Sequence, residues 1–268
     1  MPELPEVETI SRSMACNVGA SIERLEFRRT DIIRLQDFAP ERLAGKTIKA
    51  IYRRGKFLVF VFPRGHHLVV HLGMSGRLYM LDQDEEAAGK HVHLVVHMDN
   101  GRRLAYQDAR RFGGVWLVAD IRAFFCRMGP EPLGDEFTAL YLAQILSGRH
   151  TAVKNLLLDQ NLIAGIGNIY ADEALFAAGI RPDRPADSLS EAEISLLWQA
   201  IRDVLESSIE ARGTTFRDYR DGFNQSGGFQ HQLKVYGKDE QPCSCCGELI
   251  KKGRIGGRGT HFCEKCQQ

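Results

Sequence analysis

The sequence predicts a multidomain α+β protein: an N-terminal antiparallel β-sandwich or barrel with flanking helices, then a helical domain, then a separate cysteine-rich hairpin module. Three observations predict this fold. Short apolar or alternating runs, separated by turn signals, recur from about residue 22 to residue 120. The pattern becomes helical after the Gly- and Pro-rich segment 129–134, and most of the cysteines lie near the C-terminal end. The predicted domains span residues 1–131, 132–233 and 234–268.

The individual elements follow in chain order. A first helix is expected over residues 5–18. Strands are expected at residues 56–62, 67–72, 92–98 and 114–119, with a hairpin turn at 99–101. Further helices are expected at residues 138–147, 152–159, 167–178 and 190–212, the last opened by a capping box of Ser190 and Glu193. Residues 213–233 carry Gly, Ser and Asn but few aliphatic side chains, which predicts an exposed, mobile loop.

Composition restricts the class of protein. The 268 residues are 44% hydrophobic and 26% charged with a net charge of +1, so bulk charge neither indicates nor excludes a nucleic-acid partner. No run of 18 apolar residues and no signal-like N-terminus is present, so we expect a cytoplasmic protein without a membrane partner. The odd cysteine count argues against a disulfide framework, and we expect Cys16 and Cys126 to be reduced, buried thiols.

The C-terminal cysteines have the spacing of a metal site. Two C-x-x-C pairs, separated by sixteen residues, consist of Cys243, Cys246, Cys263 and Cys266. This spacing predicts a zinc ribbon with four thiolate ligands. Cys245 is an alternative ligand, but Gly247 allows a tight knuckle turn directly after Cys246. Because four thiolates fill a tetrahedral site, we expect one structural Zn²⁺ and no catalytic metal or organic cofactor.

Two segments have features of phosphate-binding sites. Residues 251–260, between the cysteine pairs, contain four cations and four glycines without an acidic residue, which favours contact with a phosphate backbone. A solvated surface turn is the alternative. Residues 162–173 form a glycine-bearing turn leading into a helix, where backbone amides can hold a phosphate and Asn168 is a cap or a direct ligand. Ordinary helix capping is the alternative here.

Two loops of the β-rich half carry apolar side chains beside glycines or arginines. Met74 lies between glycines in residues 71–76, and Phe112 follows Arg110 and Arg111. Proteins that kink a duplex insert such apolar wedges between base steps. Core packing of Met74 and Phe112 is the alternative.

Histidines alternate along one predicted strand, at His91 and His93 with His97 nearby. No matching carboxylate accompanies them, so this pattern favours a phosphate contact or a hydrogen-bonded histidine over a metal site.

Pro2 has two interpretations. With Met1 removed, it presents a secondary amine, and an α-amino group has a pKa of roughly 7.7–8.0. Such an amine can attack an aldehyde carbon and form an iminium, with Glu3 and Glu6 beside it as proton carriers. The alternative is structural, because proline is favoured in the first helical turn and acidic residues there complement the helix dipole.

Taken together, these segments resemble the bacterial formamidopyrimidine-DNA glycosylases, the oxidised-purine branch of the Fpg/Nei family. The resemblance covers essentially the whole chain. It includes, in order, residues 2–8, 54–56, the Met74 segment, 90–93, 110–113, 159–173 and the ribbon with 257–260. It implies an N-terminal β-sandwich, a helix-two-turn-helix domain and a zinc finger, with DNA in the cleft between the domains.

The resemblance implies a bifunctional glycosylase and AP lyase of base excision repair that removes 8-oxoguanine and formamidopyrimidines. Pro2 would attack C1′ of the damaged nucleotide, and Glu3 would transfer protons. Lys56 would donate a proton during β-elimination and contact phosphate. Arg258 would grip the lesion phosphate and assist δ-elimination, leaving a one-nucleotide gap with phosphates at both ends.

The implied partner is damaged double-stranded DNA, bound by a monomer in the bacterial cytoplasm at the nucleoid. Positions that bind or position DNA are Glu6, His91, Arg110, Arg149, Lys154 and Asn168. Met74, Arg110 and Phe112 match the trio that fills the void left by base flipping, with Arg110 facing the orphaned cytosine. Residues 213–232 match the mobile lid over the lesion. Ala109 stands where the family usually has proline, which predicts a more flexible loop at Arg110.

Three competing functions are retained. An endonuclease VIII-like enzyme acting on oxidised pyrimidines is disfavoured by the N-terminal segment 2–5 and by the Arg-Arg-Phe wedge. A DNA-binding protein without catalysis is disfavoured by the presence of Pro2, Glu3 and Lys56. A zinc hydrolase is disfavoured because protein thiolates occupy all four predicted zinc positions.

Overall fold

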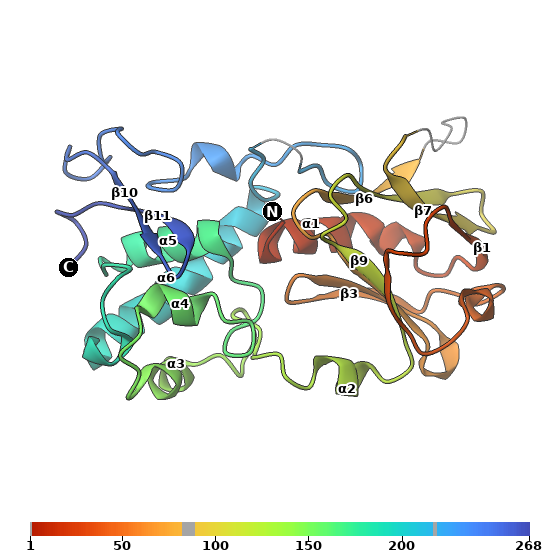
Figure 1. Cartoon of the computed structure of the whole chain (residues 1–268), viewed down its shortest axis with the longest axis horizontal. Helices are drawn as coiled ribbons and strands as arrows, with labels where there is room; N and C mark the ends of the chain where they lie inside the picture. Colours follow the sequence, from red (N-terminus) through yellow and green to blue (C-terminus); the bar gives the residue numbers. More distant parts are fainter. Residues whose placement is uncertain (1, 82–88, 217–218) are drawn as a thin grey trace. The chain divides into compact units, whose positions relative to one another are not determined.

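In the computed structural model, which describes residues 2–81, 89–216 and 219–268, the chain divides into two units (Figure 1). The first unit comprises the residues up to Arg127 together with Ala211–Gly228. The second comprises Met128–Glu210 together with Phe229–Gln268. Most of the segment expected as a lid on the helical domain thus groups with the N-terminal unit, and the cysteine module groups with the helices. The division into three domains stays a prediction.

The first unit contains two β-sheets. The four-stranded sheet has the order β1 (Ile22–Phe27), β7 (Val92–Met98), β8 (Arg103–Asp108) and β6 (Gly76–Leu81). The five-stranded sheet has the order β2 (Ile33–Gln36), β9 (Gly114–Val118), β5 (His67–His71), β4 (Phe57–Val61) and β3 (Ala50–Arg54). The predicted strands are therefore confirmed. The pairing is antiparallel except at one edge, where β2 runs parallel to β9, so the purely antiparallel expectation is wrong there.

Helix α1 (Leu4–Met14) supplies the third side of the first core. Its apolar residues Val7, Ile10 and Met14 are buried in one hydrophobic cluster with inward-facing residues of both sheets, such as Leu58 and Tyr106. The alternation of apolar side chains along the strands directs one face of each sheet into this cluster. The sandwich prediction is confirmed by this arrangement.

Two of the loops that connect one sheet with the other lie against each other. The Met74 loop (residues 72–75) joins β5 to β6, and the Arg110 loop (residues 109–113) joins β8 to β9. Gly73 has φ +60°, and a Cβ there would lie 2.4 Å from the Gly113 nitrogen. Only glycine permits this approach of backbone to backbone, so the two loops are in direct contact.

The second unit is mainly helical. Its helices are α3 (Ala139–Leu146), α4 (Val153–Leu157), α5 (Asn168–Ala177) and α6 (Glu191–Glu210). The predicted capping box of α6 is confirmed, since Glu193 Oε2 accepts from the Ser190 N–H at 2.8 Å and Ser190 Oγ accepts from the Glu193 N–H at 3.3 Å. The four predicted helices lie at the expected positions, with ends that differ by one or two residues.

Shorter helical segments complete the chain. Helix α2 (Ile121–Phe125), in the first unit, was not predicted, although Asp120 caps it by accepting from the Arg122 and Ala123 N–H groups. Single 3₁₀ turns occur at Ala15–Asn17, Pro40–Leu43, Pro63–Gly65, Ala186–Ser188 and Phe229–His231. None of the described helices is long and apolar enough to cross a membrane.

The cysteine module contains a hairpin of β10 (Lys251–Ile255) and β11 (Arg258–Phe262), joined by Gly256 and Gly257. Both glycines have positive φ, at +53° and +76°, which explains the glycine pair in this two-residue turn. The base of the module is anchored by a small buried cluster that consists of Phe176, Val235, Cys243, Ile250 and Cys263. Phe176 of α5 thus ties the module to the helices.

Two expectations about exposure are wrong. Cys16 and Cys126 are exposed rather than buried. The segment 213–233 is not uniformly exposed, since Tyr219 and Asp221 are only 8% and 1% exposed and Tyr219 belongs to the first core. An aromatic ring and an acid with internal hydrogen-bond partners anchor this glycine-rich segment, which its composition does not show. The expected loop also includes residues 217–218, which lie outside the described residues.

Candidate functional site

Pro2 lies at the entrance to helix α1 and is buried, as are Glu3 and Glu6. Glu3 is the N-cap, and its N–H donates to Glu6 Oε2 at 2.8 Å in a reciprocal capping box. The helix therefore begins after Pro2. Pro2 precedes the first turn and is not one of the helical residues. Two carboxylates follow it, Glu3 at the N-cap and Glu6 in the first turn.

Glu6 also holds the segment 211–228. Its second oxygen, Oε1, accepts from the Thr214 N–H at 2.7 Å, and Gly213 packs so closely that a Cβ there would lie 2.9 Å from the same oxygen. The hydroxyl of buried Tyr219 donates to the Glu6 carbonyl at 3.3 Å. Glu6 thus links the start of α1 to the segment expected to form the lid, a positioning task distinct from direct DNA contact.

Lys56 occupies the turn between β3 and β4 and is only 8% exposed. Close by, burial first and the charge of Lys56 second lower the pKa of His71 to about 4. His71 is therefore neutral at physiological pH, and its Nδ1 accepts a hydrogen bond from the Gly73 N–H at 3.0 Å. The charge of a lysine thus acts on a neutral imidazole where β5 leads into the Met74 loop.

The tips of the two connecting loops are exposed. Phe112 is 61% and Met74 is 42% exposed, so the alternative of core packing is wrong for both side chains. The Arg110 guanidinium lies 5.2 Å from the centre of the Phe112 ring, a cation–π arrangement that presents cation and aromatic together. Both apolar side chains are therefore available for contact with a partner, as a wedge would need to be.

Arg111, the residue between Arg110 and Phe112, is held through both its backbone and its side chain. Arg111 has φ +55°, and its carbonyl accepts from Arg34 Nη2 at 2.7 Å. Its guanidinium reaches Asp31 at 2.5 Å. Hydrogen bonds from Arg29 and then from Arg111 lower the pKa of Asp31 to about 2, so this anchor stays charged.

The strand histidines differ in role. His93 is buried, and its Nε2 lies 2.8 Å from the Asp108 carbonyl. His97 Nε2 lies 3.0 Å from Glu26 Oε2. His91 is partly exposed, and its carbonyl accepts from the Asp108 N–H at 3.0 Å. Among the described residues, these histidines belong to no group of three or more potential metal ligands.

In the second unit, Lys154 is fully buried. Its Nζ lies 2.6 Å from Asp172 Oδ1 and donates to the Gly259 carbonyl at 3.0 Å and to Thr260 Oγ1 at 2.8 Å. Asp172 also accepts from the His261 N–H at 2.9 Å. The buried pair thus fixes the strand that begins with Arg258, and Lys154 acts on that hairpin rather than at the surface.

The hairpin is also held by the start of α5. Asn168 is the first helical residue, because Gly167 takes the N-cap position, so the capping interpretation of Asn168 is wrong. Its Nδ2 donates to the Gly259 carbonyl at 2.9 Å. Its Oδ1 is buried without a hydrogen-bond partner among the described residues. Arg258 and Arg149 are both exposed.

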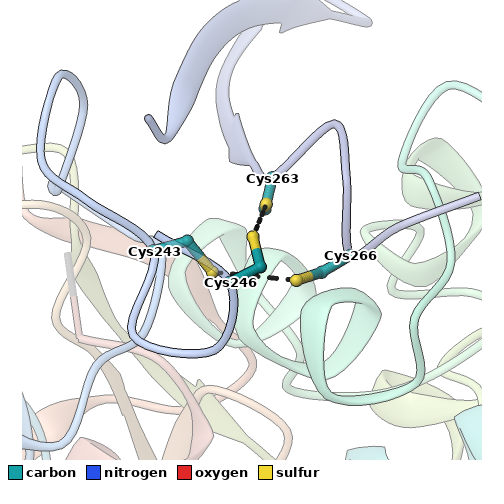
Figure 2. Close-up of side chains that lie close together, drawn as sticks. All are labelled: Cys243, Cys246, Cys263 and Cys266. Atoms are coloured by element: carbon teal, nitrogen blue, oxygen red, sulfur yellow. Dashed lines mark hydrogen bonds between the residues drawn. The ribbon is translucent and has the colours of Figure 1, made fainter. Parts of the chain in front are cut away.

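The four predicted cysteines come together (Figure 2). Their sulfur atoms all lie within 4.8 Å of one another, with 3.8 Å between Cys243 and Cys266 and 3.5 Å between Cys246 and Cys263. Thiolates around a tetrahedral ion with metal–sulfur bonds of about 2.3 Å stand roughly 3.8 Å apart, so this cluster fits such an ion. Cys245 is exposed and lies outside the cluster, so the cluster contains Cys246 and not the alternative ligand Cys245.

The environment of Cys243 favours the thiolate. Burial alone would raise its pKa, but the backbone N–H groups of Cys245 and Cys246 outweigh burial and lower the pKa of Cys243 to about 7. Amide groups directed at sulfur are typical of metal-binding knuckles, because a metal binds the deprotonated thiol.

Two buried acids that hold these loops and the hairpin were not identified from the sequence. Asp108 and Asp172 are buried carboxylates that hold the Met74 loop, the Arg110 loop and the hairpin in place. No spacing rule indicates them, since Ser75 is 33 residues from Asp108 and His261 is 89 residues from Asp172.

The chain matches known protein families in both of its units. Residues 1–115 match the formamidopyrimidine-DNA glycosylase N-terminal domain, and residues 128–220 match the formamidopyrimidine-DNA glycosylase H2TH domain. A formamidopyrimidine-DNA glycosylase of Syntrophomonas wolfei is 57% identical over 268 residues, covering 100% of both chains.

Solved structures agree as well. The complex of a Lactococcus lactis FPG mutant with DNA containing Fapy-dG has a TM-score of 0.93 at 37% identity, with 100% of each chain covered. A MutM complex with DNA containing carbocyclic 8-oxo-G has a TM-score of 0.92 at 36% identity, again with 100% of each chain covered.

These matches span both units. The chain therefore belongs to the formamidopyrimidine-DNA glycosylase family. It is a DNA glycosylase of the kind that acts on damaged DNA.

Proposed function

We propose that this chain excises oxidised purines, 8-oxoguanine and formamidopyrimidines, from duplex DNA and then cleaves the strand as an AP lyase. The observation that carries the proposal is the position of Pro2 ahead of α1, followed by the carboxylates of Glu3 at the N-cap and Glu6 in the first turn. Two solved relatives are complexes with DNA containing Fapy-dG and carbocyclic 8-oxo-G, which supports the substrate class.

The proposed chemistry starts at the Pro2 nitrogen, freed by removal of Met1. Its lone pair forms a bond to C1′, the bond between C1′ and the base breaks, and the base departs with a proton. Glu3 carries protons between sugar and base. Opening of the sugar ring leaves an iminium between Pro2 and C1′. An α-amino group has a pKa of roughly 7.7–8.0, so a fraction of such groups is unprotonated and nucleophilic at neutral pH.

Strand cleavage follows from the iminium. Loss of a proton from C2′ sends an electron pair toward the positive nitrogen, and the 3′ phosphate leaves with the C3′–O bond electrons. Lys56, charged beside neutral His71, donates a proton in this step and contacts phosphate. A second elimination releases the 5′ phosphate, assisted by Arg258. The product is a gap with phosphates at both ends.

The DNA contacts are divided between the units. Met74, Arg110 and Phe112 fill the void left by the flipped nucleotide, with Arg110 facing the orphaned cytosine. His91, Arg149 and Arg258 contact phosphates. Lys154 and Asn168 act through the hairpin carbonyl at Gly259, and Glu6 acts through the lid segment at Thr214.

The four-cysteine cluster holds one structural Zn²⁺ in this proposal. Four thiolates close the coordination sphere, so the ion supplies rigidity to the hairpin and takes no part in the reaction. The enzyme acts as a monomer on damaged double-stranded DNA in the bacterial cytoplasm, where the nucleoid provides its substrate, and needs no other cofactor.

The decisive experiment is borohydride trapping on a duplex with 8-oxoguanine opposite cytosine, followed by peptide mass spectrometry. We expect a covalent adduct at Pro2, lost in Pro2→Gly and kept in Pro5→Ala, the matched proline of the same segment. An adduct only with an oxidised-pyrimidine duplex would instead indicate an endonuclease VIII-like enzyme. Absence of an adduct even on an abasic duplex, with Met1 removed, would indicate a protein that binds DNA without cutting it.

A further inference from the structure

We propose that Asp108 is a positioning residue that joins the Met74 loop to the Arg110 loop, so that the wedge side chains of both loops act on DNA as one unit. This inference rests on the proposed function, in which Met74, Arg110 and Phe112 fill the void beside a flipped nucleotide. It assigns to a buried carboxylate the task of setting the spacing of three exposed side chains.

Asp108 is the last residue of β8 and is 0% exposed. Its Oδ1 accepts from the Ser75 hydroxyl at 2.6 Å, which ties it to the Met74 loop. Its Oδ2 accepts from the Gly113 N–H at 2.9 Å, and Oδ1 also accepts from the Arg110 N–H at 3.3 Å. One carboxylate therefore holds the Met74 loop and both ends of the Arg110 loop.

Ser75 completes the link. Its hydroxyl donates to Asp108 and accepts from the Arg110 N–H at 3.2 Å, so it bridges the two loops directly. A carboxylate suits this position because it accepts on both oxygens and donates from neither. An asparagine whose Oδ1 accepts from the Gly113 N–H would direct its N–H₂ group at the Ser75 hydroxyl and at the Arg110 N–H. The Ser75 hydroxyl would then have to accept instead of donate, and the bond from the Arg110 N–H would be lost because two donors face each other there.

The glycine contact between the loops makes this link effective. A Cβ on Gly73 would lie 2.4 Å from the Gly113 nitrogen and 2.5 Å from the Phe112 carbonyl carbon. Because the backbones touch, a shift of one loop displaces the other as long as Asp108 and Ser75 hold them together. Met74 and Phe112 are exposed, so their positions are set by the backbone beneath them rather than by packing around them.

The functional consequence is coupling between Met74 and Phe112. Side chains that enter a void from one rigid support avoid part of the ordering cost that independent loops would incur. Loss of one should therefore change the effect of losing the other. With the link at Asp108 broken, the two side chains should contribute independently.

The test is a mutant cycle on single-turnover excision of 8-oxoguanine opposite cytosine. Met74→Ala, Phe112→Ala and the pair are measured with Asp108 intact and with Asp108→Asn. With Asp108 intact, we expect the effect of the pair to differ at least about threefold from the product of the single effects. With Asp108→Asn, we expect the effects to multiply. Asp120→Asn is the matched control, since Asp120 also accepts two backbone N–H groups of the first unit, and should keep the coupling.

A second measurement separates positioning from a general loss of structure. We expect Asp108→Asn to slow excision from the duplex by roughly tenfold. Cleavage of an abasic site in single-stranded DNA, where there is no opposite strand to support, should stay within about twofold of the unaltered protein. Equal slowing on both substrates would overturn the inference.

The possible failures are distinguishable. If Met74→Ala and Phe112→Ala leave duplex excision unchanged, the proposed wedge itself is wrong. If they slow excision but the coupling is absent, or survives Asp108→Asn, the wedge stands and the positioning inference is wrong. Should Asp108→Asn fail to fold, Ser75→Ala removes the bridge from a surface loop. It is expected to reduce the coupling, and unaltered coupling in that variant would overturn the inference.

Discussion

The Met74 and Arg110 loops of the first unit differ from the cysteine hairpin of the second unit in how they are held. All three present exposed side chains on turns that contain glycine. The Met74 and Arg110 loops rest on a buried carboxylate, a serine and a glycine contact. The hairpin rests on four cysteine sulfur atoms and on the buried Lys154–Asp172 pair. The first unit has a large core under its loops, whereas the hairpin is anchored by a small cluster around Phe176.

This difference shows which kind of support a loop needs and which kind a hairpin needs. A loop that connects two packed sheets inherits their rigidity, so a few hydrogen bonds suffice to fix it. A two-stranded hairpin buries too little apolar surface to be stable alone, so it requires a metal or a buried ion pair. The hairpin should therefore respond to metal removal, and the loops should respond only to changes in their hydrogen bonds.

The largest expected effect comes from breaking the metal cluster. Cys263→Ser, or removal of metal by a chelator, should lower DNA affinity at least about 100-fold, because metal binding provides the folding free energy of such hairpins. The first unit should keep its fold, as followed by circular dichroism. Cys245→Ser, outside the cluster, is the control and should bind DNA normally. Unaltered affinity after verified metal loss would show that the hairpin is not a DNA clamp.

The buried ion pair should give the next largest effect. Lys154→Met leaves Asp172 buried without its partner, and we expect the free energy of unfolding to fall by about 3–5 kcal/mol in urea denaturation. Lys252→Met, which removes an exposed pair with Asp239, should cost less than about 1 kcal/mol.

A double variant tests the origin of that loss. Lys154→Met combined with Asp172→Leu should recover much of the stability, because no uncompensated charge stays buried. A double variant as unstable as Lys154→Met alone would contradict the assignment of the loss to the orphaned carboxylate.

In the first unit, His71 at the start of the Met74 loop should make the free energy of unfolding depend on pH. Its pKa is about 4 when folded, against a model-peptide value of about 6.5 when unfolded. Between these values the unfolded chain binds more protons, so stability falls as pH is lowered from about 6.5 to about 4, by a total of about 3 kcal/mol. Above and below this window the contribution of His71 is constant with pH.

Denaturation at several pH values checks this prediction. His71→Asn should flatten the pH dependence between about pH 4 and 6.5, because asparagine does not titrate and its oxygen can replace Nδ1 as acceptor for Gly73. His231→Asn, at an exposed histidine of the second unit, should leave the slope unchanged. A slope that persists in His71→Asn would assign it to another group.

The smallest expected effect concerns the opposite base. Arg110→Ala should reduce the preference for lesions opposite cytosine by roughly tenfold, with little change in stability, since Arg110 is exposed. Competition between duplexes that differ only in the opposite base measures this preference. Arg122→Ala, another exposed arginine of the first unit, is the control, and selectivity that survives Arg110→Ala would remove Arg110 from base recognition.

The sequence by itself determined features that depend on short-range patterns. Alternating apolar residues predicted the strands, the capping box predicted the start of α6, and cysteine spacing predicted the cluster that the structure contains. The N-terminal segment, the Arg-Arg-Phe motif and the ribbon also sufficed to indicate the family, because these motifs carry their chemistry within a few residues of one another.

Tertiary structure decided which side chains are buried and which are paired. The sequence marked Lys154 as a DNA-binding position, but its ammonium group is enclosed with Asp172 beneath the hairpin. It expected Cys16 and Cys126 inside and placed most of the lid segment with the helices, while the chain exposes the thiols and packs Tyr219 into the first core. Buried polar groups need partners, and those partners come from segments that are distant in the sequence, so only the folded chain fixes them.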